Sequence, residues 1–180
     1  KAITLFKIFS RLKFKPNEIL LEMNNDLKET NPPGTFVTSI VGCYNINTDI
    51  VEIANAGHQP ALLRKGKEFV EYSSSSTPLA IVKHKDESVY KLDTFKLDGG
   101  RIYCFTDGFS ECMDENKNEI GIDGVKKLLL NHQNSSLQKE LENSTEEIRI
   151  KSLKKDYKET GINNNNDILD DDLTIIGIGY

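Results

Sequence analysis

The order in which hydrophobic periodicity changes along the chain is the strongest constraint on its fold. Apolar residues recur at helical spacing in residues 1–30, form short β-type runs in residues 35–106, and return to helical spacing after Gly121. A last apolar run, residues 173–180, has the length of a strand. Helices on either side of a block of strands predict an α+β sandwich with sheets inside and helices outside.

Two amphipathic helices are predicted at the start of the chain. The first carries an apolar stripe formed by Leu5, Ile8, Phe9 and Leu12. The second starts at Pro16, which the first helical position tolerates, and ends before the Pro32-Pro33-Gly34 stop. An apolar stripe without a partner would favour a homodimer through these helices.

Seven strands are predicted after the second helix. They are Phe36–Tyr44, Ile50–Ala54, Ala61–Leu63, Phe69–Tyr72, Ser88–Leu97, Arg101–Thr106 and Leu173–Tyr180. The first four are expected to form an antiparallel meander, and Asp98-Gly99-Gly100 predicts a hairpin between the fifth and sixth. The first strand is apolar on both faces, so we expect a further layer on each.

The C-terminal third is predicted to contain helices and a loop. Two or three helices follow from the spacing of Val125, Leu128, Leu129, Leu137, Leu141 and Ile148. Residues 154–172 are polar and rich in asparagine and aspartate, which predicts a long, mobile loop.

Composition excludes several classes of function. The 180 residues suffice for one domain, and no apolar run approaches the roughly 20 residues of a membrane-spanning helix. A net charge of -5 without a basic cluster argues against nucleic-acid binding. The three cysteines, Cys43, Cys104 and Cys112, are odd in number and lack zinc-site spacing, which favours a reducing cytoplasm; no export signal is recognisable.

Asp107 follows the sixth predicted strand. The next residue, Gly108, would let the backbone turn and leave room for a ligand, so that Asp107 is held rigidly and exposed. An ordinary Asp-Gly turn after a strand is the alternative, and on the dipeptide alone it is the better interpretation.

Three adjacent carboxylates, Asp170, Asp171 and Asp172, precede the last predicted strand. They repel one another unless water or a cation neutralises them. Carboxylates without His or Cys partners select hard cations such as Mg²⁺ or Mn²⁺. An acidic, solvated loop end is the alternative, and the three residues alone favour it.

A tight polar turn containing Asn55, Gly57 and His58 joins two predicted strands. Its histidine could be a ligand or a general acid, but a turn-locking role is favoured. The other histidines, His84 and His132, lie in Lys-rich and Asn-rich contexts that indicate no site. Motifs for covalent catalysis and for nucleotide hydrolysis are absent from the sequence.

Several short motifs occur in a fixed order along nearly the whole chain. They are Lys15-Pro16 through Leu27, Phe36-Val37-Thr38, Asn55-Ala56-Gly57-His58-Gln59-Pro60, Pro78-Leu79-Ala80-Ile81, Phe105-Thr106-Asp107-Gly108-Phe109-Ser110-Glu111, Asn118-Glu119-Ile120-Gly121 and Asp171-Asp172-Leu173-Thr174. In this order they resemble the SpoIIE-type, RsbU-like bacterial branch of the metal-dependent PPM serine/threonine phosphatases. The resemblance implies an α-β-β-α sandwich of antiparallel sheets flanked by helices.

The resemblance also implies a two-metal site. Asp107 and Asp171 would be ligands of Mn²⁺ or Mg²⁺, with Gly108 and Asp172 beside them, and a metal-activated water would hydrolyse phosphoserine or phosphothreonine. The protein would then be a hydrolase that needs no catalytic side chain of its own.

Three departures from the family pattern accompany the resemblance. Ala80 stands where the family has glycine, and Gly100 where it commonly has aspartate. The family's Asp-x-Ser-Gly-His-Gly segment, with its bridging aspartate, would by register lie just before Lys1. Residues 1–180 are therefore expected to be an N-terminally truncated phosphatase domain that is inactive by itself.

Partners and regulation are implied by the same resemblance. The expected substrate is a phosphorylated regulatory protein, such as an anti-anti-sigma factor in sigma-factor or stress signalling. The helical pair in residues 1–30 would be a regulatory element that can displace the first metal ligand. A non-catalytic PPM-like module that acts by protein–protein binding, and a carboxylate-rich metal-binding scaffold, stay open as alternatives.

Overall fold

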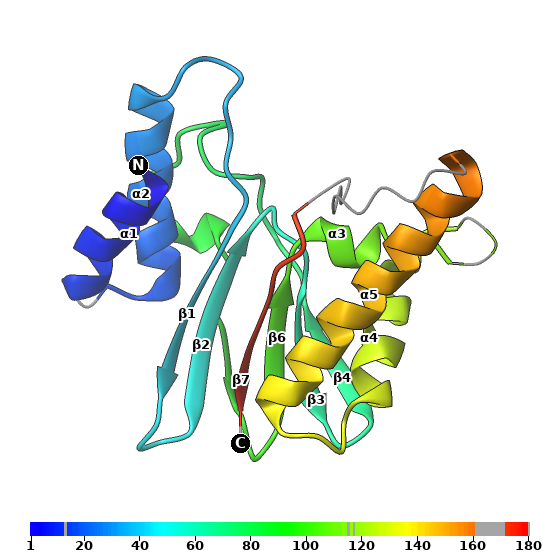
Figure 1. Ribbon diagram of the computed structural model, residues 1–180. Helices are drawn as coiled ribbons and strands as arrows, with labels where there is room; N and C mark the ends of the chain where they lie inside the picture. Colours follow the sequence, from blue (N-terminus) through cyan, green and yellow to red (C-terminus); the bar gives the residue numbers. More distant parts are fainter. Residues whose placement is uncertain (13, 115, 117, 161–171, 180) are drawn as a thin grey trace. The chain divides into compact units, whose positions relative to one another are not determined.

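The computed structural model describes residues 1–12, 14–114, 116, 118–160 and 172–179, without the side chains of residues 151–160 (Figure 1). The chain divides into two compact units. The first comprises Lys1–Ala61 and Val70–Asp98, and the second comprises Leu62–Phe69 and Gly99–Tyr180. Both combine antiparallel strands with helices, which confirms the predicted α+β class.

A three-stranded sheet and two α-helices form the first unit. Its elements are α1 (Ala2–Arg11), α2 (Pro16–Thr30), β1 (Ser39–Asn45), β2 (Ile50–Ala56), the 3₁₀ helix η1 (Glu87–Val89) and β5 (Asp93–Lys96). The sheet order is β1-β2-β5, with Val41 opposite Ala54 and Val51 opposite Phe95. Helix α2 packs on β1 and β2, and α1 packs on α2. The two predicted N-terminal helices are thus confirmed.

Helix α2 forms where the sequence places its start and stop signals. Pro16 occupies the first turn, and the Lys15 backbone N–H donates to Glu18 Oε2 at 2.6 Å, which satisfies a group that the helix start leaves unpaired. The apolar face of the helix, formed by Ile19, Leu20, Met23 and Leu27, is buried in the core.

One polar residue, Asn24, lies within this apolar face and is 0% exposed. Its Nδ2 donates to the Val82 carbonyl at 2.9 Å, and its Oδ1 accepts from the Ala80 N–H at 2.9 Å. Ala80 has a φ of 71°, in the left-handed region that glycine adopts at little cost. The structure thereby explains why the resembled family has glycine at this position.

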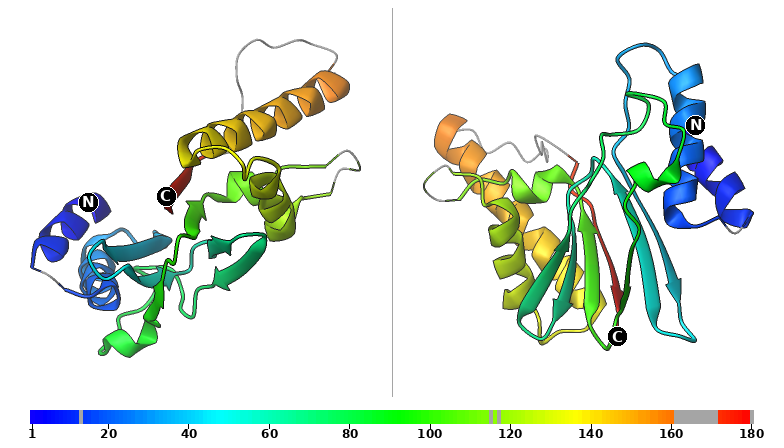
Figure 2. Two further views of the ribbon diagram at one scale, coloured as in Figure 1. Left: turned by 90° about the horizontal axis from the view of Figure 1, so that it is seen from below. Right: turned by 180° about the vertical axis from the view of Figure 1, so that it is seen from behind.

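A four-stranded sheet with the order β4-β3-β6-β7 and three helices make up the rest of the fold. Its elements are β3 (Ala61–Lys65), β4 (Glu68–Tyr72), β6 (Arg101–Phe105), α3 (Asp107–Ser110), α4 (Gly121–Asn131), α5 (Leu137–Thr160) and β7 (Ile175–Gly179). Helices α4 and α5 contact each other and lie on one face of the sheet (Figures 1 and 2). The core between these helices and the sheet includes Leu62, Phe105, Leu129 and Ile148.

Two predicted strand connections are wrong. Strand β5 pairs with β2, whereas β6 pairs with β3 and β7, so Asp98-Gly99-Gly100 carries the chain from one sheet to the other and does not close a hairpin. Likewise β2 and β3 belong to different sheets, which interrupts the predicted meander. Turn residues permit a positive φ, here 49° at Asp98, but they do not specify which strand pairs next.

Two further predictions need correction. Phe36 precedes β1 and is 58% exposed, so the expected cover on both faces of that run is incomplete among the described residues. Helix α5 extends to Thr160, so residues 154–160 are helical and not part of a loop, whereas residues 161–171 lie outside the described residues. Lysine, glutamate and leucine are good helix formers, and a polar composition alone does not exclude a helix.

No helix in the described parts of the chain is long and apolar enough to cross a membrane.

Candidate functional site

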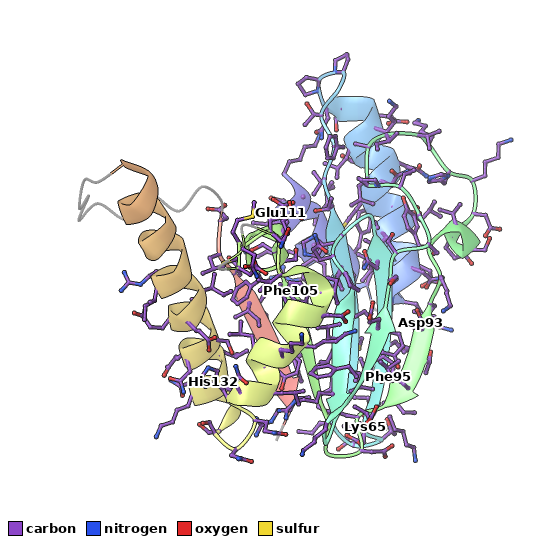
Figure 3. All side chains as sticks on the ribbon, turned by 90° about the vertical axis from the view of Figure 1, so that its right-hand side faces the viewer. Lys65, Asp93, Phe95, Phe105, Glu111 and His132 are labelled. Carbon is purple, nitrogen blue, oxygen red and sulfur yellow. The ribbon has the colours of Figure 1, made fainter. Side chains whose placement is uncertain are left out.

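The C-terminal end of β6 and the segment before β7 lie side by side at one end of the four-stranded sheet. The strands are antiparallel, and Phe105 opposite Ile175 is their last pair in register. This pairing brings Asp107, two residues beyond β6, to the same end of the sheet as Asp172. Both residues are exposed. Figure 3 labels Phe105 and Glu111, which flank the Asp107 turn along the chain.

Thr106 joins these two segments through its backbone and its side chain. Its N–H donates to the Thr174 carbonyl at 3.0 Å. Its hydroxyl donates to the Asp172 carbonyl at 2.6 Å, and the same oxygen accepts from the Thr174 N–H at 3.0 Å. The sequence analysis gave this threonine no role, although it lies directly before the predicted ligand.

Gly108 allows the two segments to approach closely. A Cβ atom added to Gly108 would lie 2.9 Å from the Asp172 carbonyl oxygen, closer than real Cβ atoms come to other atoms. Its φ is not positive, so the backbone conformation alone would accept another residue. The space expected for a ligand beside this glycine is therefore taken by the Asp172 backbone.

Asp107 is the first residue of the short helix α3. Its carbonyl accepts from the Ser110 hydroxyl at 3.0 Å and from the Glu111 N–H at 2.8 Å. Phe109, on the same turn, is fully buried and lies edge-to-face against Phe105 with ring centroids 6.3 Å apart. The backbone of Asp107 is thus anchored while its carboxylate faces solvent, as the sequence predicted.

The donor chemistry at this edge suits a hard divalent cation. Asp107 and Asp172 both offer carboxylate oxygens, which Mg²⁺ and Mn²⁺ prefer. Asp170 and Asp171 lie outside the described residues. Within the described part of the chain, no group of three or more His, Cys, Asp and Glu side chains could hold a metal ion. The described residues by themselves therefore do not form a metal site.

The turn with Asn55, Gly57 and His58 lies in the first unit and is locked by hydrogen bonds. The His58 N–H donates to Asn55 Oδ1 at 2.9 Å, and His58 Nδ1 lies 3.0 Å from Thr38 Oγ1. The Gly57 N–H donates to the Ser74 hydroxyl at 2.7 Å, a contact that the sequence analysis missed. These contacts agree with a structural role for His58.

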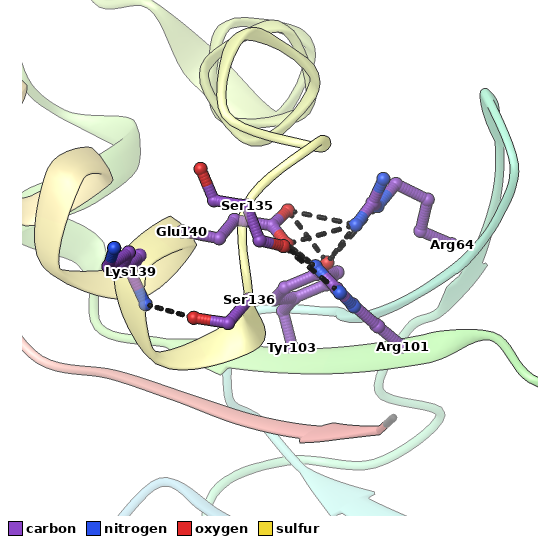
Figure 4. Close-up of polar contacts among 7 residues, drawn as sticks. All are labelled: Arg64, Arg101, Tyr103, Ser135, Ser136, Lys139 and Glu140. Carbon is purple, nitrogen blue, oxygen red and sulfur yellow. Dashed lines mark hydrogen bonds and ion pairs between the residues drawn. The ribbon is translucent and has the colours of Figure 1, made fainter.

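A buried charge cluster in the second unit was also missed (Figure 4). Glu140 of α5 is 0% exposed and accepts from Arg64 Nη2 at 3.0 Å through both carboxylate oxygens. Arg101 also pairs with Glu140. The Tyr103 hydroxyl accepts from Arg64 and donates to Glu140 at 2.9 Å. Burial raises the pKa of Tyr103 to about 12, so this donor is retained at neutral pH.

A signal for this cluster was present in the sequence. Glu140 lies three residues after Leu137 and eight before Ile148, which is helical spacing and places it on the apolar face of α5. A carboxylate on such a face needs a cationic partner. The sequence alone could not identify that partner, because Arg64 is 76 residues away.

Comparisons with known proteins agree on one family. The sequence model of the family described as Stage II sporulation protein E (SpoIIE) matches residues 1–180. The phosphoserine phosphatase RsbU of Bacillus subtilis (strain 168) is 26% identical over 128 residues, which cover 71% of this chain and 38% of RsbU. The chain thus spans well under half the length of this relative.

Solved structures share the fold. The RsbU and RsbW domains of a Mycobacterium tuberculosis protein match with a TM-score of 0.70 and 18% identity, over 98% of this chain and 45% of that one. The SiaA-PP2C domain of Pseudomonas aeruginosa matches with a TM-score of 0.71 and 16% identity, over 92% and 61%. The phosphatase domain of SpoIIE from Bacillus subtilis matches with a TM-score of 0.54 and 13% identity, over 99% and 73%. The fold is therefore that of PP2C-type phosphatases.

Proposed function

Because the chain belongs to the SpoIIE family, we propose that it is part of a metal-dependent protein serine/threonine phosphatase domain. The proposal is carried by one observation: the Asp107 turn and the Asp172 segment lie next to each other at one end of the four-stranded sheet, joined by hydrogen bonds of Thr106. These segments contain the two motifs that resemble the family's metal ligands. RsbU, a relative of this chain, is itself named a phosphoserine phosphatase.

In this proposal Asp107 and Asp171 bind Mn²⁺ or Mg²⁺, and Gly108 and Asp172 lie beside them. When bound, such ions would supply a water activated for hydrolysis and positive charge for the phosphoryl oxygens. The chain's own contribution is geometric: Thr106 and the bare Gly108 backbone keep the two carboxylate-bearing segments together. No side chain of the chain is required as a nucleophile.

The proposed substrate is a phosphoserine or phosphothreonine of a regulatory protein, such as an anti-anti-sigma factor. The proposed location is the cytoplasm, because Cys43, Cys104 and Cys112 are all free thiols. Burial raises the pKa of Cys104 to about 11, which keeps that thiol protonated and unreactive.

Phosphate release from a phosphoserine peptide, measured with and without Mn²⁺, tests the proposed activity. Two proteins are compared: the 180-residue chain, and the same chain preceded by an Asp-x-Ser-Gly-His-Gly segment. We expect the first to bind Mn²⁺ weakly and to turn over slowly or not at all, since loss of groups that merely support metal ligands costs roughly 10–100-fold. The extended protein should release phosphate only when Mn²⁺ is present.

Substitutions in the extended protein test the residue roles. Asp107→Asn and Asp171→Asn should each abolish Mn²⁺-dependent release and leave the melting temperature nearly unchanged. His58→Ala should lower the melting temperature while the folded protein keeps its rate. Full activity of Asp107→Asn would overturn the site. Partner binding without any phosphate release would instead support the non-catalytic module.

A further inference from the structure

Strand β7 is an edge strand of the four-stranded sheet, and its outer side carries backbone groups without a partner strand. In an antiparallel pair, alternate residues direct their N–H and C=O groups toward the neighbouring strand and the others direct them away. Thr174 directs its groups toward β6, because its carbonyl accepts from the Thr106 N–H at 3.0 Å. By the same alternation Ile175, Gly177 and Gly179 direct theirs away from β6, and among the described residues no further strand pairs there. The outer edge therefore offers donors and acceptors to another extended backbone.

This edge lacks the charged side chains found at the other edge of the same sheet. Strand β4, at the far end of the strand order, carries Glu68 and Glu71. Charged side chains on an edge strand discourage pairing with a further strand. Strand β7 reads Ile-Ile-Gly-Ile-Gly, without a charged residue or a proline, and Ile176 and Ile178 are 61% and 43% exposed. The sequence of β7 thus favours addition of a strand that places apolar side chains beside these two isoleucines.

Helix α5 and the start of β7 line a groove on the face of the sheet that α5 covers. Its apolar wall consists of residues that also pack against the core: Leu141, Leu173 and Ile175. Two exposed carboxylates of α5, Glu142 and Glu146, line the same groove. Glu146 accepts from Arg149 Nε at 2.9 Å, whereas Glu142 accepts from the neutral Gln138 amide at 2.9 Å and has no cationic partner among the described residues. A basic side chain that entered the groove would therefore meet a carboxylate without a counter-ion.

The packing of α5 favours a single strand over a second copy of the chain at this edge. A Cβ atom added to Gly177 would lie 2.9 Å from Leu137 Cδ1, so α5 packs directly over β7. In a dimer with two β7 strands paired about Gly177, the two α5 helices would lie over strands about 4.8 Å apart. Packed helices need about 8–10 Å between their axes. A symmetric strand-to-strand dimer therefore has no room for its helices.

We propose that the outer edge of β7 binds an extended segment of a partner polypeptide. This segment runs antiparallel to β7, as β6 does, and bonds to the outward backbone groups of the strand. Its apolar side chains lie beside Ile176 and Ile178, and its basic side chains enter the groove near Glu142. In this mode of recognition main-chain bonds give affinity, and side chains at alternate positions give selectivity. The surface is separate from the proposed function and does not require it.

Binding of the peptide Thr-Val-Thr-Val-Lys-Thr-Lys to the 180-residue chain, followed by NMR at low ionic strength, tests the proposed surface. In antiparallel register its valines lie beside the exposed isoleucines of β7, and its lysines lie on the face covered by α5. Hydrogen exchange of the Ile175, Gly177 and Gly179 amides should become slower in the complex. The peptide Thr-Val-Pro-Val-Lys-Thr-Lys lacks the N–H group opposite Gly177 and should bind about tenfold more weakly.

Substitutions in the protein test the role of charge. Glu142→Gln removes the carboxylate that faces the peptide lysines, so we expect binding to weaken about two- to fivefold. Glu68→Gln makes the same chemical change on β4, at the other edge of the sheet, and should leave binding unchanged. The difference between the two variants should shrink as the salt concentration rises.

Slower exchange at the three outward amides, together with this order of affinities, would support strand addition at β7. The absence of binding by the lysine peptide, equal binding of the proline peptide, or equal effects of Glu142→Gln and Glu68→Gln would overturn it. Protection of the Ile175, Gly177 and Gly179 amides in the free chain would also overturn it. Protection that depends on protein concentration would assign the edge to a second copy, and protection that does not would assign it to residues of the same chain.

Discussion

The two units bury polar side chains in opposite ways. In the first, Asn24 of α2 is fully buried and makes neutral hydrogen bonds to the backbone of the Ala80–Val82 segment. In the second, Glu140 of α5 is equally buried but faces the guanidinium groups of Arg64 and Arg101. Both residues tie a helix to a neighbouring part of its own unit, one through an amide and the other through charge.

The two units should therefore differ in their sensitivity to loss of the buried polar side chain. Removal of the buried Asn24 amide leaves two backbone groups without partners, which lowers the free energy of unfolding by about 1–3 kcal/mol. Removal of the buried Glu140 carboxylate leaves the Arg64 and Arg101 guanidinium groups without a counter-ion in a poorly solvating interior. This lowers the free energy of unfolding by about 3–5 kcal/mol. The second unit should therefore depend more strongly on its polar residue than the first.

The largest expected effect is that of Glu140→Gln. We expect the free energy of unfolding to fall by about 3–5 kcal/mol, because Arg64 and Arg101 lose their counter-ion. Urea denaturation followed by circular dichroism measures the loss. Glu142→Gln, on an exposed position of the same helix, is the control and should change stability by about 0.5 kcal/mol at most. Equal effects of the two substitutions would contradict the buried ionic cluster.

Asn24→Ala should have the next largest effect. The Ala80 N–H and the Val82 carbonyl would be left without their partner, so we expect a loss of about 1–3 kcal/mol in the same urea experiment. Asn143→Ala, at an exposed position of α5, makes the same chemical change and should have little effect. A loss as large as that of Glu140→Gln would remove the distinction between the units.

Ala80→Gly should stabilise the first unit. The left-handed backbone at Ala80 is strained for a residue with a Cβ atom, and relief of that strain should exceed the entropy cost of glycine by about 0.5–1 kcal/mol. Ala54→Gly, in the buried strand β2, should have the opposite sign. The two melting temperatures, measured by calorimetry, check the prediction, and destabilisation by both substitutions would refute it.

The smallest expected effect on stability concerns the surface of α1. Of the predicted stripe, Ile8 and Leu12 are 51% and 59% exposed, whereas Leu5 is buried and Phe9 packs against the core. Phe6, next to the stripe, is 39% exposed. Phe6→Ser with Ile8→Ser should change the free energy of unfolding by about 0.5 kcal/mol or less. If the stripe joins two copies, light scattering should show a dimer for the wild-type chain and a monomer for the variant. A monomeric wild-type chain would contradict the predicted homodimer.

Local signals in the sequence determined much of the fold. Pro16 and Glu18 set the start of α2, apolar spacing identified α4, and the turn around Asp107 was correctly expected to be anchored and exposed. The ordered motifs also led to the family. These features depend on residues close together in the chain, where propensity, capping and periodicity act directly.

The pairing of distant segments could not be predicted from local signals in the sequence. Asp98-Gly99-Gly100 was expected to close a hairpin but connects strands of two different sheets. Glu140 pairs with Arg64, which is 76 residues away in the sequence. Thr106 has the sequence signature of a helix cap, yet its hydroxyl bonds to residues 172 and 174. Turn and capping preferences limit the local backbone, whereas the choice among distant partners depends on which contacts bury apolar surface and satisfy polar groups together.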